Sequence, residues 1–451
     1  MRAQLEVIPL DVHDECPTVD IVFTGCRSNA DWYAFDIIDF PNRKIDRWKL
    51  PFARNDKWPV EIRTKMYPVH MPFGRQDVRA YCDDHYMTPH TAQLSPQGKL
   101  FVTFGVSENG FGFFVIDTKT GECEFIDSGD DASKLFASTG DFDPSYRRFL
   151  FSSWPMSNTP RDVKKRVANT FEIKSLDIDT LEQRSLYAMT ERVQDGKVQD
   201  AGLPRSLHQV SMSEDGRYIV CAPFDGIQEG PASSAPVADE RAVHKFVGTH
   251  RAILEDVITI DLQASRHWFT KIPVPVPAHV EYDPLDPHVF YASAHNIAGT
   301  TIGTMLEGNA KLFRLRIRDG KTDIVGGYTD PELYRITQHS LFVHDGRVLV
   351  ALTCVPNRLV ILDAESMTLW RDIKLFDAPP IKLTDAGALS PDYVFSVYSV
   401  NPCADGKYIV LENGRDFIFY GMDEDRVLDM RVSRSIPADF RGRGHTRTAG
   451  Q

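Results

Sequence analysis

The chain has 451 residues, of which 42% are hydrophobic and 25% are charged, and its net charge is −12. This composition is typical of a globular protein that can bury a core. No block of lysine and arginine dominates, so the acidic balance argues against a nucleic-acid partner. No apolar run approaches the roughly 20 residues that span a bilayer, and we expect no membrane span.

The cysteines are scattered singly along the chain, and their number is odd: Cys16, Cys26, Cys82, Cys123, Cys221, Cys354 and Cys403. No pair has the CxxC spacing of a metal or redox motif, which favours reduced thiols over a disulfide framework. The first residues lack the apolar core of a signal peptide. We therefore expect a cytoplasmic protein.

Two kinds of short apolar strand alternate along the whole chain. The first kind follows a turn, and it recurs at 20–24, 99–104, 148–153, 217–222, 288–293, 347–352 and 407–412. The second kind runs into an acidic turn, and it recurs at 35–39, 114–117, 176–179, 258–261, 315–319, 361–363 and 420–423. Seven strands of each kind in strict alternation indicate a repeat architecture.

These repeats predict an all-β, seven-bladed propeller with four-stranded blades, because radial closure leaves few exposed sheet edges. We expect it to be a single domain over residues 1–433, followed by a flexible basic tail over 434–451. The first blade lacks a clear innermost strand. Either residues 3–18 or a C-terminal segment must complete the ring.

The connections between second and third strands are long in three consecutive blades, at 154–169, 223–251 and 294–309. Loops of this length in a compact fold are usually functional or disordered. In a propeller they lie on the face where the innermost strands begin. Their placement predicts a lid over the central opening.

A histidine recurs near the start of the predicted innermost strand in four blades. His90, His208 and His279 each precede the following turn residue (Gly98, Gly216 and Pro287) by eight positions, and His339 precedes Gly346 by seven. One reading is that four imidazoles converge on the axis and bind one transition metal. The other reading is that inner strands line a wet channel, where a histidine simply bonds its neighbours.

Neutral imidazole suits zinc, copper, iron and nickel, and an all-nitrogen set argues against calcium or magnesium. Four neutral ligands leave the metal its full charge and leave coordination positions open, which implies chemistry rather than a structural role. Three further residues are candidates for acid/base or substrate contacts near this site: His85, His295 and Tyr398.

The repeat plan and the four histidines resemble the carotenoid cleavage oxygenases. Those enzymes are seven-bladed propellers that hold Fe(II) on four axial histidines and split an alkene bond with O2. The resemblance implies Fe(II) on His90, His208, His279 and His339, with copper or zinc as alternatives. It does not include that family's local motifs or its C-terminal histidine ligand, because the last blade here offers Tyr398. Copper propellers of the selenium-binding-protein kind and histidine-metal propeller lyases are similar in plan.

Two classes of function follow from the sequence. The first is a metal-dependent enzyme acting on a small, partly apolar organic substrate, with oxygenase or other redox chemistry ahead of lyase, isomerase or hydrolase chemistry. The second is a non-catalytic propeller scaffold for protein interactions. The one-sided long loops and the absence of a WD or kelch string favour the enzyme.

Overall fold

The computed structural model describes residues 2–10, 22–28, 32–39, 41–53, 89–106, 109–127, 134–137, 140–155, 170–190, 193–194, 197–198, 204–227, 251–252, 256–273, 277–294, 310–333, 335–355, 357–375, 399–403, 405–412, 417–428 and 441–442. Every regular element in these ranges is a β-strand. Within them there is no helix that could cross a membrane.

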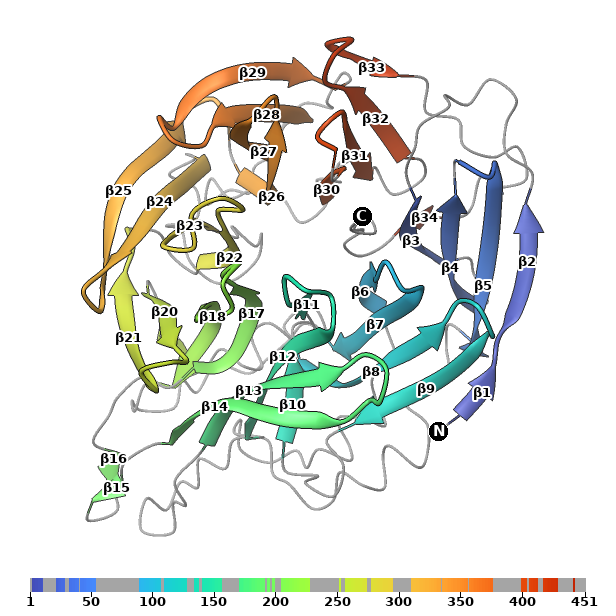
Figure 1. Cartoon of the computed structure of the whole chain (residues 1–451), viewed down its shortest axis with the longest axis horizontal. Helices are drawn as coiled ribbons and strands as arrows, with labels where there is room; N and C mark the ends of the chain where they lie inside the picture. Colours follow the sequence, from blue (N-terminus) through green and yellow to red (C-terminus); the bar gives the residue numbers. More distant parts are fainter. Residues whose placement is uncertain are drawn as a thin grey trace, which may run out of the picture.

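The described strands form seven antiparallel blades, which follow one another round a ring in chain order (Figure 1). Their members, from the innermost strand outwards, are as follows. Blade 1 contains β3 (Val22–Ser28), β4 (Trp32–Asp39) and β5 (Lys44–Ala53). Blade 2 contains β6 (Pro89–Leu94), β7 (Lys99–Val106), β8 (Asn109–Asp117) and β9 (Glu122–Asp127). Blade 3 contains β11 (Asp141–Phe142), β12 (Arg148–Pro155), β13 (Thr170–Asp177) and β14 (Gln183–Thr190).

The other four blades are regular. Blade 4 contains β17 (Pro204–Met212), β18 (Tyr218–Ile227), β20 (Asp256–Asp261) and β21 (Arg266–Lys271). Blade 5 contains β22 (Pro277–Tyr282), β23 (Val289–Ala294), β24 (Ala310–Arg318) and β25 (Lys321–Asp330). Blade 6 contains β26 (Arg335–His344), β27 (Arg347–Val355), β28 (Arg358–Asp363) and β29 (Thr368–Lys374). Blade 7 contains β30 (Ser399–Pro402), β31 (Tyr408–Glu412), β32 (Phe417–Gly421) and β33 (Arg426–Leu428). The predicted seven-bladed propeller is confirmed.

Segments from both ends of the chain complete the first two blades. The C-terminal β34 (Arg441–Gly442) pairs with β3 on the inner side of blade 1. The N-terminal β2 (Glu6–Leu10) pairs with the outer strand β5, whereas β1 (Arg2–Gln4) pairs with β9 of blade 2. Leu5 lies between β1 and β2 and is buried. The N-terminal segment therefore joins blades 1 and 2 along their outer edges.

Further short strands supplement the blades. β10 (Lys134–Ala137) pairs with β8 of blade 2 and with β12 of blade 3, and so links these two blades into one sheet. β19 (Arg251–Ala252) pairs with the end of β18, and β15 (Val193–Gln194) forms a separate hairpin with β16 (Lys197–Val198).

Apolar side chains from facing blades form the core between them. Blades 5 and 6 share a cluster that includes Tyr291 and Leu352, and blades 6 and 7 share one that includes Ile361 and Leu411. The ring is closed by a cluster that joins Ile38 of blade 1 to side chains of blade 7. Because full burial of a large aliphatic side chain contributes about 1.5–3 kcal/mol, these interfaces account for the closed ring.

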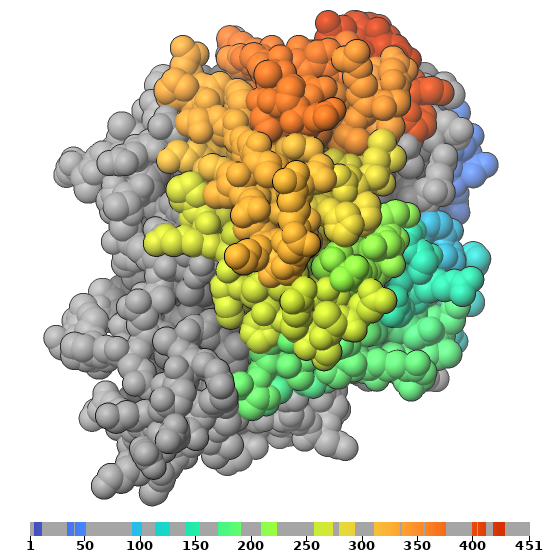
Figure 2. Space-filling view, turned by 60° about the vertical axis from the view of Figure 1, so that its left-hand side comes forward, coloured from blue at the N-terminus to red at the C-terminus, as the bar shows by residue number. Residues whose placement is uncertain are grey.

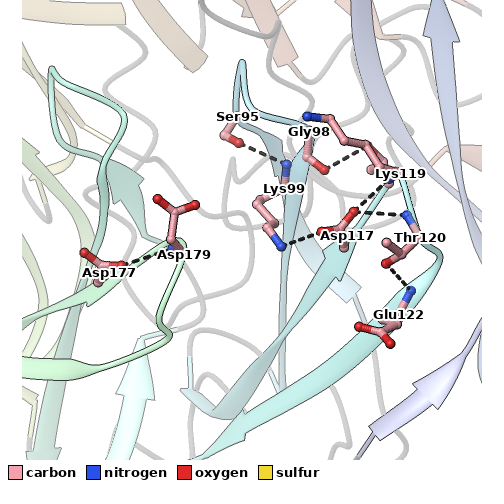
Figure 3. A network of polar contacts seen from close by, with 10 residues as sticks. Ser95, Gly98, Lys99, Asp117, Lys119, Thr120, Glu122, Asp177 and Asp179 are labelled. Carbon is pink, nitrogen blue, oxygen red and sulfur yellow. Dashed lines mark hydrogen bonds and ion pairs between the residues drawn. The ribbon is translucent and has the colours of Figure 1, made fainter.

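The acidic turn predicted after each third strand has a repeated structure. Asp117 ends β8, its carboxylate accepts the N–H groups of Lys119 and Thr120, and Lys99 Nζ lies 2.6 Å from it (Figure 3). Gly121, four residues after the aspartate, has a φ of +79° and donates its N–H to Asp117 O at 2.8 Å. The same turn follows Asp177 and Asp363, where Leu181 and Met367 have positive φ. An aspartate that caps the turn's N–H groups stabilises this tight connection.

Candidate functional site

The four repeated histidines lie on innermost strands, each at a shift in the ladder or within two residues of one. His90 is the residue skipped between the pairs Pro89–Phe104 and Thr91–Thr103, and His208 is skipped in the same way in β17. In β22 the skipped residue directly precedes His279. In β26 the shift occurs two residues before His339. The described inner strand of blade 7, β30, pairs with β31 without a shift.

A β-bulge opposes two residues to one, bends its strand and re-aims a side chain, and bulges are frequent next to active sites. His279 pairs with Ser293, the penultimate residue of β23. The histidine level therefore lies at the end of the blade from which the second-to-third connections leave. This placement agrees with the geometry expected of a site beneath those connections.

The imidazole of His279 is bound by a glutamine of the preceding blade. His279 is 3% exposed, and its Nδ1 lies 3.3 Å from Oε1 of Gln209 in β17. The same amide oxygen accepts the N–H of Val280 at 3.2 Å. An amide oxygen can only accept, so Nδ1 of His279 carries the proton and Nε2 carries the lone pair of the neutral ring. Metal-bound histidines typically donate the other ring nitrogen in this way.

His339 is held similarly, by a hydroxyl of blade 5. Its Nδ1 lies 2.8 Å from Oγ of Ser293, and the side chain is 3% exposed. The rings of His279 and His339 meet edge to face, with centroids 6.1 Å apart and planes at 80°. Two of the four predicted site residues are thus brought into contact across the junction of blades 5 and 6.

The two described histidines do not by themselves make up a metal site. An imidazole nitrogen lies about 2.0–2.1 Å from a bound metal, so two rings on one ion have centroids no more than roughly 6–7 Å apart. The observed 6.1 Å is near that limit, which two ligands reach only on opposite sides of an ion, whereas ligands at right or tetrahedral angles have centroids roughly 4.5–5.2 Å apart. Among the residues whose side chains are described, no group of three or more histidine, cysteine, aspartate or glutamate side chains is placed to hold a metal.

Five candidate residues lie where the structure does not describe the side chain. The side chains of His90 and His208 are not described, although their strands are. His85, His295 and Tyr398 lie outside the described residues, as do 156–169, 228–250 and 295–309 of the expected lid. Their roles stay predictions.

Sequence reasoning missed the side chains that join the inner strands of successive blades. Gln209 bridges blades 4 and 5, and Oε1 of Gln338 accepts the N–H of Val400 at 3.0 Å between blades 6 and 7. Gln93 donates to Gly140 O between blades 2 and 3. Each of these glutamines lies within three residues of a repeated histidine, but the offset differs: −1 for Gln338, +1 for Gln209 and +3 for Gln93. No fixed spacing therefore marks them in the sequence.

Comparisons with known proteins give little beyond the fold. No family model matches the chain, and no curated protein matches it. Among solved structures, the hydrazine synthase of Kuenenia stuttgartiensis is similar with a TM-score of 0.46 and 13% sequence identity, over 76% of this chain and 86% of that chain. An assignment of function has to come from the residues of this chain.

Proposed function

We propose that the chain is a metal-dependent propeller enzyme that acts on a small, partly apolar organic substrate. The observation that supports it most is the recurrence of a ladder shift at the histidine level in blades 2, 4, 5 and 6. A bulge interrupts strand pairing and costs ladder hydrogen bonds, so its repetition within two residues of a histidine in four blades suggests a requirement other than sheet stability.

The proposed ligands are His90, His208, His279 and His339, and the proposed metal is Fe(II), with copper or zinc as alternatives. Such an ion would supply Lewis acidity or a site for O2. Redox chemistry of the oxygenase kind is favoured over lyase, isomerase or hydrolase chemistry, because imidazole ligands suit the redox metals iron and copper.

The chain's own residues would orient the ligands. Gln209 selects the tautomer of His279 that presents Nε2 as the lone-pair nitrogen. Ser293 fixes the ring of His339 through Nδ1. Both histidines are nearly fully buried, which removes competing water from the ligand atoms.

A propeller scaffold is the second candidate, and one observation favours it. The hydrogen bonds of Gln209, Ser293 and Gln338 all run between neighbouring blades. Buried polar groups of this kind stabilise a closed ring without any metal. Under this reading His279 and His339 are structural residues that satisfy their neighbours.

Elemental analysis of protein purified without chelators separates the two candidates. The enzyme proposal expects close to one transition-metal ion per chain, lost in His279→Ala and in His339→Ala. His288→Ala is the matched control, because His288 immediately precedes the start of β23, at the other end of blade 5. Metal-free protein that also fails to bind added Fe(II), Cu(II) or Zn(II) would favour the scaffold.

A further inference from the structure

Residues 2–10, which we call the strap, run along the outer edges of blades 1 and 2 (Figure 1). Within the strap, β1 pairs with the outer strand β9 of blade 2, and β2 pairs with the outer strand β5 of blade 1. On the side of the ring that Figure 2 brings forward, the orange surface belongs to blades 5 and 6, and within the described residues no strand is added outside β25 or β29. The strap is therefore an addition to two blades and not part of the repeat.

The strap crosses from one blade to the other at Leu5. The side chain of Leu5 is 6% exposed, and its N–H donates to Gly121 O at 3.0 Å. Gln4 Nε2 donates to Thr120 O at 2.7 Å. Gly121 has a φ of +79°, and a Cβ added to it would come within 3.4 Å of Trp48 in β5. Leu5 therefore lies where the outer edges of the two blades approach each other.

The rest of the strap is attached loosely. No residue of β2 is fully buried. The ion pair of Glu6 with Lys49 lies at the surface, where such pairs add little stability. Pro9 has no N–H to donate to the ladder. Segments with few buried apolar contacts are the first to open in a folded protein, so the strap is expected to open before the blades do.

The direct chain connection between blades 1 and 2 is long. It runs from β5 to β6 over residues 54–88 and is the longest between successive blades, whereas residues 272–276 suffice between blades 4 and 5. A long connection confines the two parts that it joins less than a short one does. The strap is therefore a second link between these two blades, on the outside of the ring.

Release of the strap bares the outer edges of β5 and β9. Unpaired N–H and C=O groups on such an edge template the addition of another strand. The segment that fits both edges is the strap itself, and every copy of the chain carries it. Since the same contacts form within one chain or between two, the strap meets the condition for strand exchange between copies.

We propose that the strap is a releasable clasp, which opens while the seven blades stay folded and whose place is then open to the same segment of a second copy. Residues 11–21 tether the strap to β3. A short flexible tether gives an effective concentration of about 1 mM or more, so at micromolar concentration each chain closes on its own strap. A second copy binds only where the resident strap has opened.

Hydrogen exchange of the full chain tests the opening. In the wild-type chain the amides of 3–8 should be at least about tenfold less protected than those of 35–38 in β4. Leu5→Asp places a charge at the buried crossing, so it should raise exchange at 122–124 of β9 by about tenfold or more and leave 349–352 of blade 6 unchanged. Val7→Asp is the matched control, because Val7 is 39% exposed on the same strap, and it should leave both regions unchanged.

A fluorescent peptide of residues 1–11 tests the acceptor by anisotropy. It should bind saturably to the full Leu5→Asp chain and at least about tenfold more weakly to the wild-type chain, whose own strap occupies the edges. The same peptide with Leu5→Asp should bind neither chain. Cys123 pairs with Ala3 of the strap, so iodoacetamide should modify Cys123 in the Leu5→Asp chain, and the wild-type peptide should slow that reaction.

Each measurement has an outcome that overturns the proposal. The clasp does not open independently if the strap amides are as protected as those of β4, or if Leu5→Asp raises exchange in all blades alike. Leu5 does not hold the strap if exchange at 122–124 stays unchanged, or if Val7→Asp has the same effect. The edges are no acceptor if the peptide fails to bind the Leu5→Asp chain or binds both chains equally.

Discussion

The imidazole of His339 meets that of His279 edge to face, with ring centroids 6.1 Å apart and planes at 80°. Each ring takes its Nδ1 partner from the preceding blade, Gln209 for His279 and Ser293 for His339. The orientation of the pair thus depends on three consecutive blades at once. A substitution that shifts any of these three blades should therefore change the orientation of the two imidazole rings.

Gln209→Ala should reduce metal affinity by about 10–100-fold, because it removes the acceptor that orients His279. Gln338→Ala is a matched control, since Gln338 also accepts an N–H from the next blade, that of Val400. Both variants should lose similar stability in urea. Titration with Fe(II) or Zn(II) should then show weaker binding in Gln209→Ala alone, and equal losses in the two variants would remove Gln209 from the site.

Arg47→Met should destabilise the fold by about 3–5 kcal/mol, because it leaves a buried carboxylate without its cation. Arg47 and Asp36 form a two-pronged ion pair at 2.7 and 2.8 Å, and both side chains are almost fully buried. Lys49→Met breaks the exposed pair with Glu6 and should cost only about 0–1 kcal/mol. Equilibrium unfolding in urea compares the two variants, and equal costs would contradict the expected role of burial.

The fold should lose stability as the pH falls below about 4, the usual pKa of an aspartate. The hydrogen bonds from Arg217 lower the pKa of Asp261, and the N–H of Thr180 lowers that of Asp177. Because the pKa is lower in the folded state, each carboxylate contributes stability above its unfolded pKa and loses it as the folded group is protonated.

Unfolding in urea at pH 6 and at pH 3 measures this loss. Arg217→Gln should raise the pKa of Asp261 and make the acid-dependent loss smaller. Arg318→Gln, which changes an exposed arginine of blade 5, should have the same pH dependence of stability as the wild-type chain. If the wild-type chain were equally stable at pH 6 and at pH 3, the lowered pKa values of Asp261 and Asp177 would be refuted.

Four cysteines should resist alkylation in the folded chain at pH 8. Burial raises the pKa of Cys123 to about 12 and raises those of Cys221, Cys354 and Cys403 as well. Since the thiolate is the reactive form, iodoacetamide should modify these positions only after unfolding. Peptide mapping by mass spectrometry checks this, and rapid native labelling of Cys354 would show that blade 6 opens.

The propeller could be predicted from the sequence because its determinants are local and repeated. In five of the blades the third strand ends at an aspartate that caps the next turn, as Asp117 does, and this spacing is visible without any tertiary contact. In blade 3 the capping residue is Asp177, two positions before the predicted end of the strand at 179. The short turn after β26 was also visible, because Asp-Gly is typical of a two-residue hairpin turn, and Asp345 and Gly346 both adopt the positive φ that such a turn requires.

The site could be predicted only in part. The histidine column was evident from its spacing, whereas the ladder shifts depend on how two strands pair and leave no signal in one strand. The partners of the histidines come from other blades, 70 residues away for Gln209 and His279. The pair of Arg47 with Asp36 was missed for a similar reason, since alternation on β4 and β5 predicts which residues share a face but not which charges are buried.

X-ray absorption spectroscopy of the metal-loaded chain tests the histidine site most directly. We expect a first shell of imidazole nitrogens at about 2.0–2.2 Å, with the multiple scattering that imidazole rings produce. The double variant His279→Ala, His339→Ala should lose that signal while the propeller remains folded. A shell made only of oxygen or sulfur, or a spectrum that the double substitution leaves unchanged, would contradict a metal bound by these histidines.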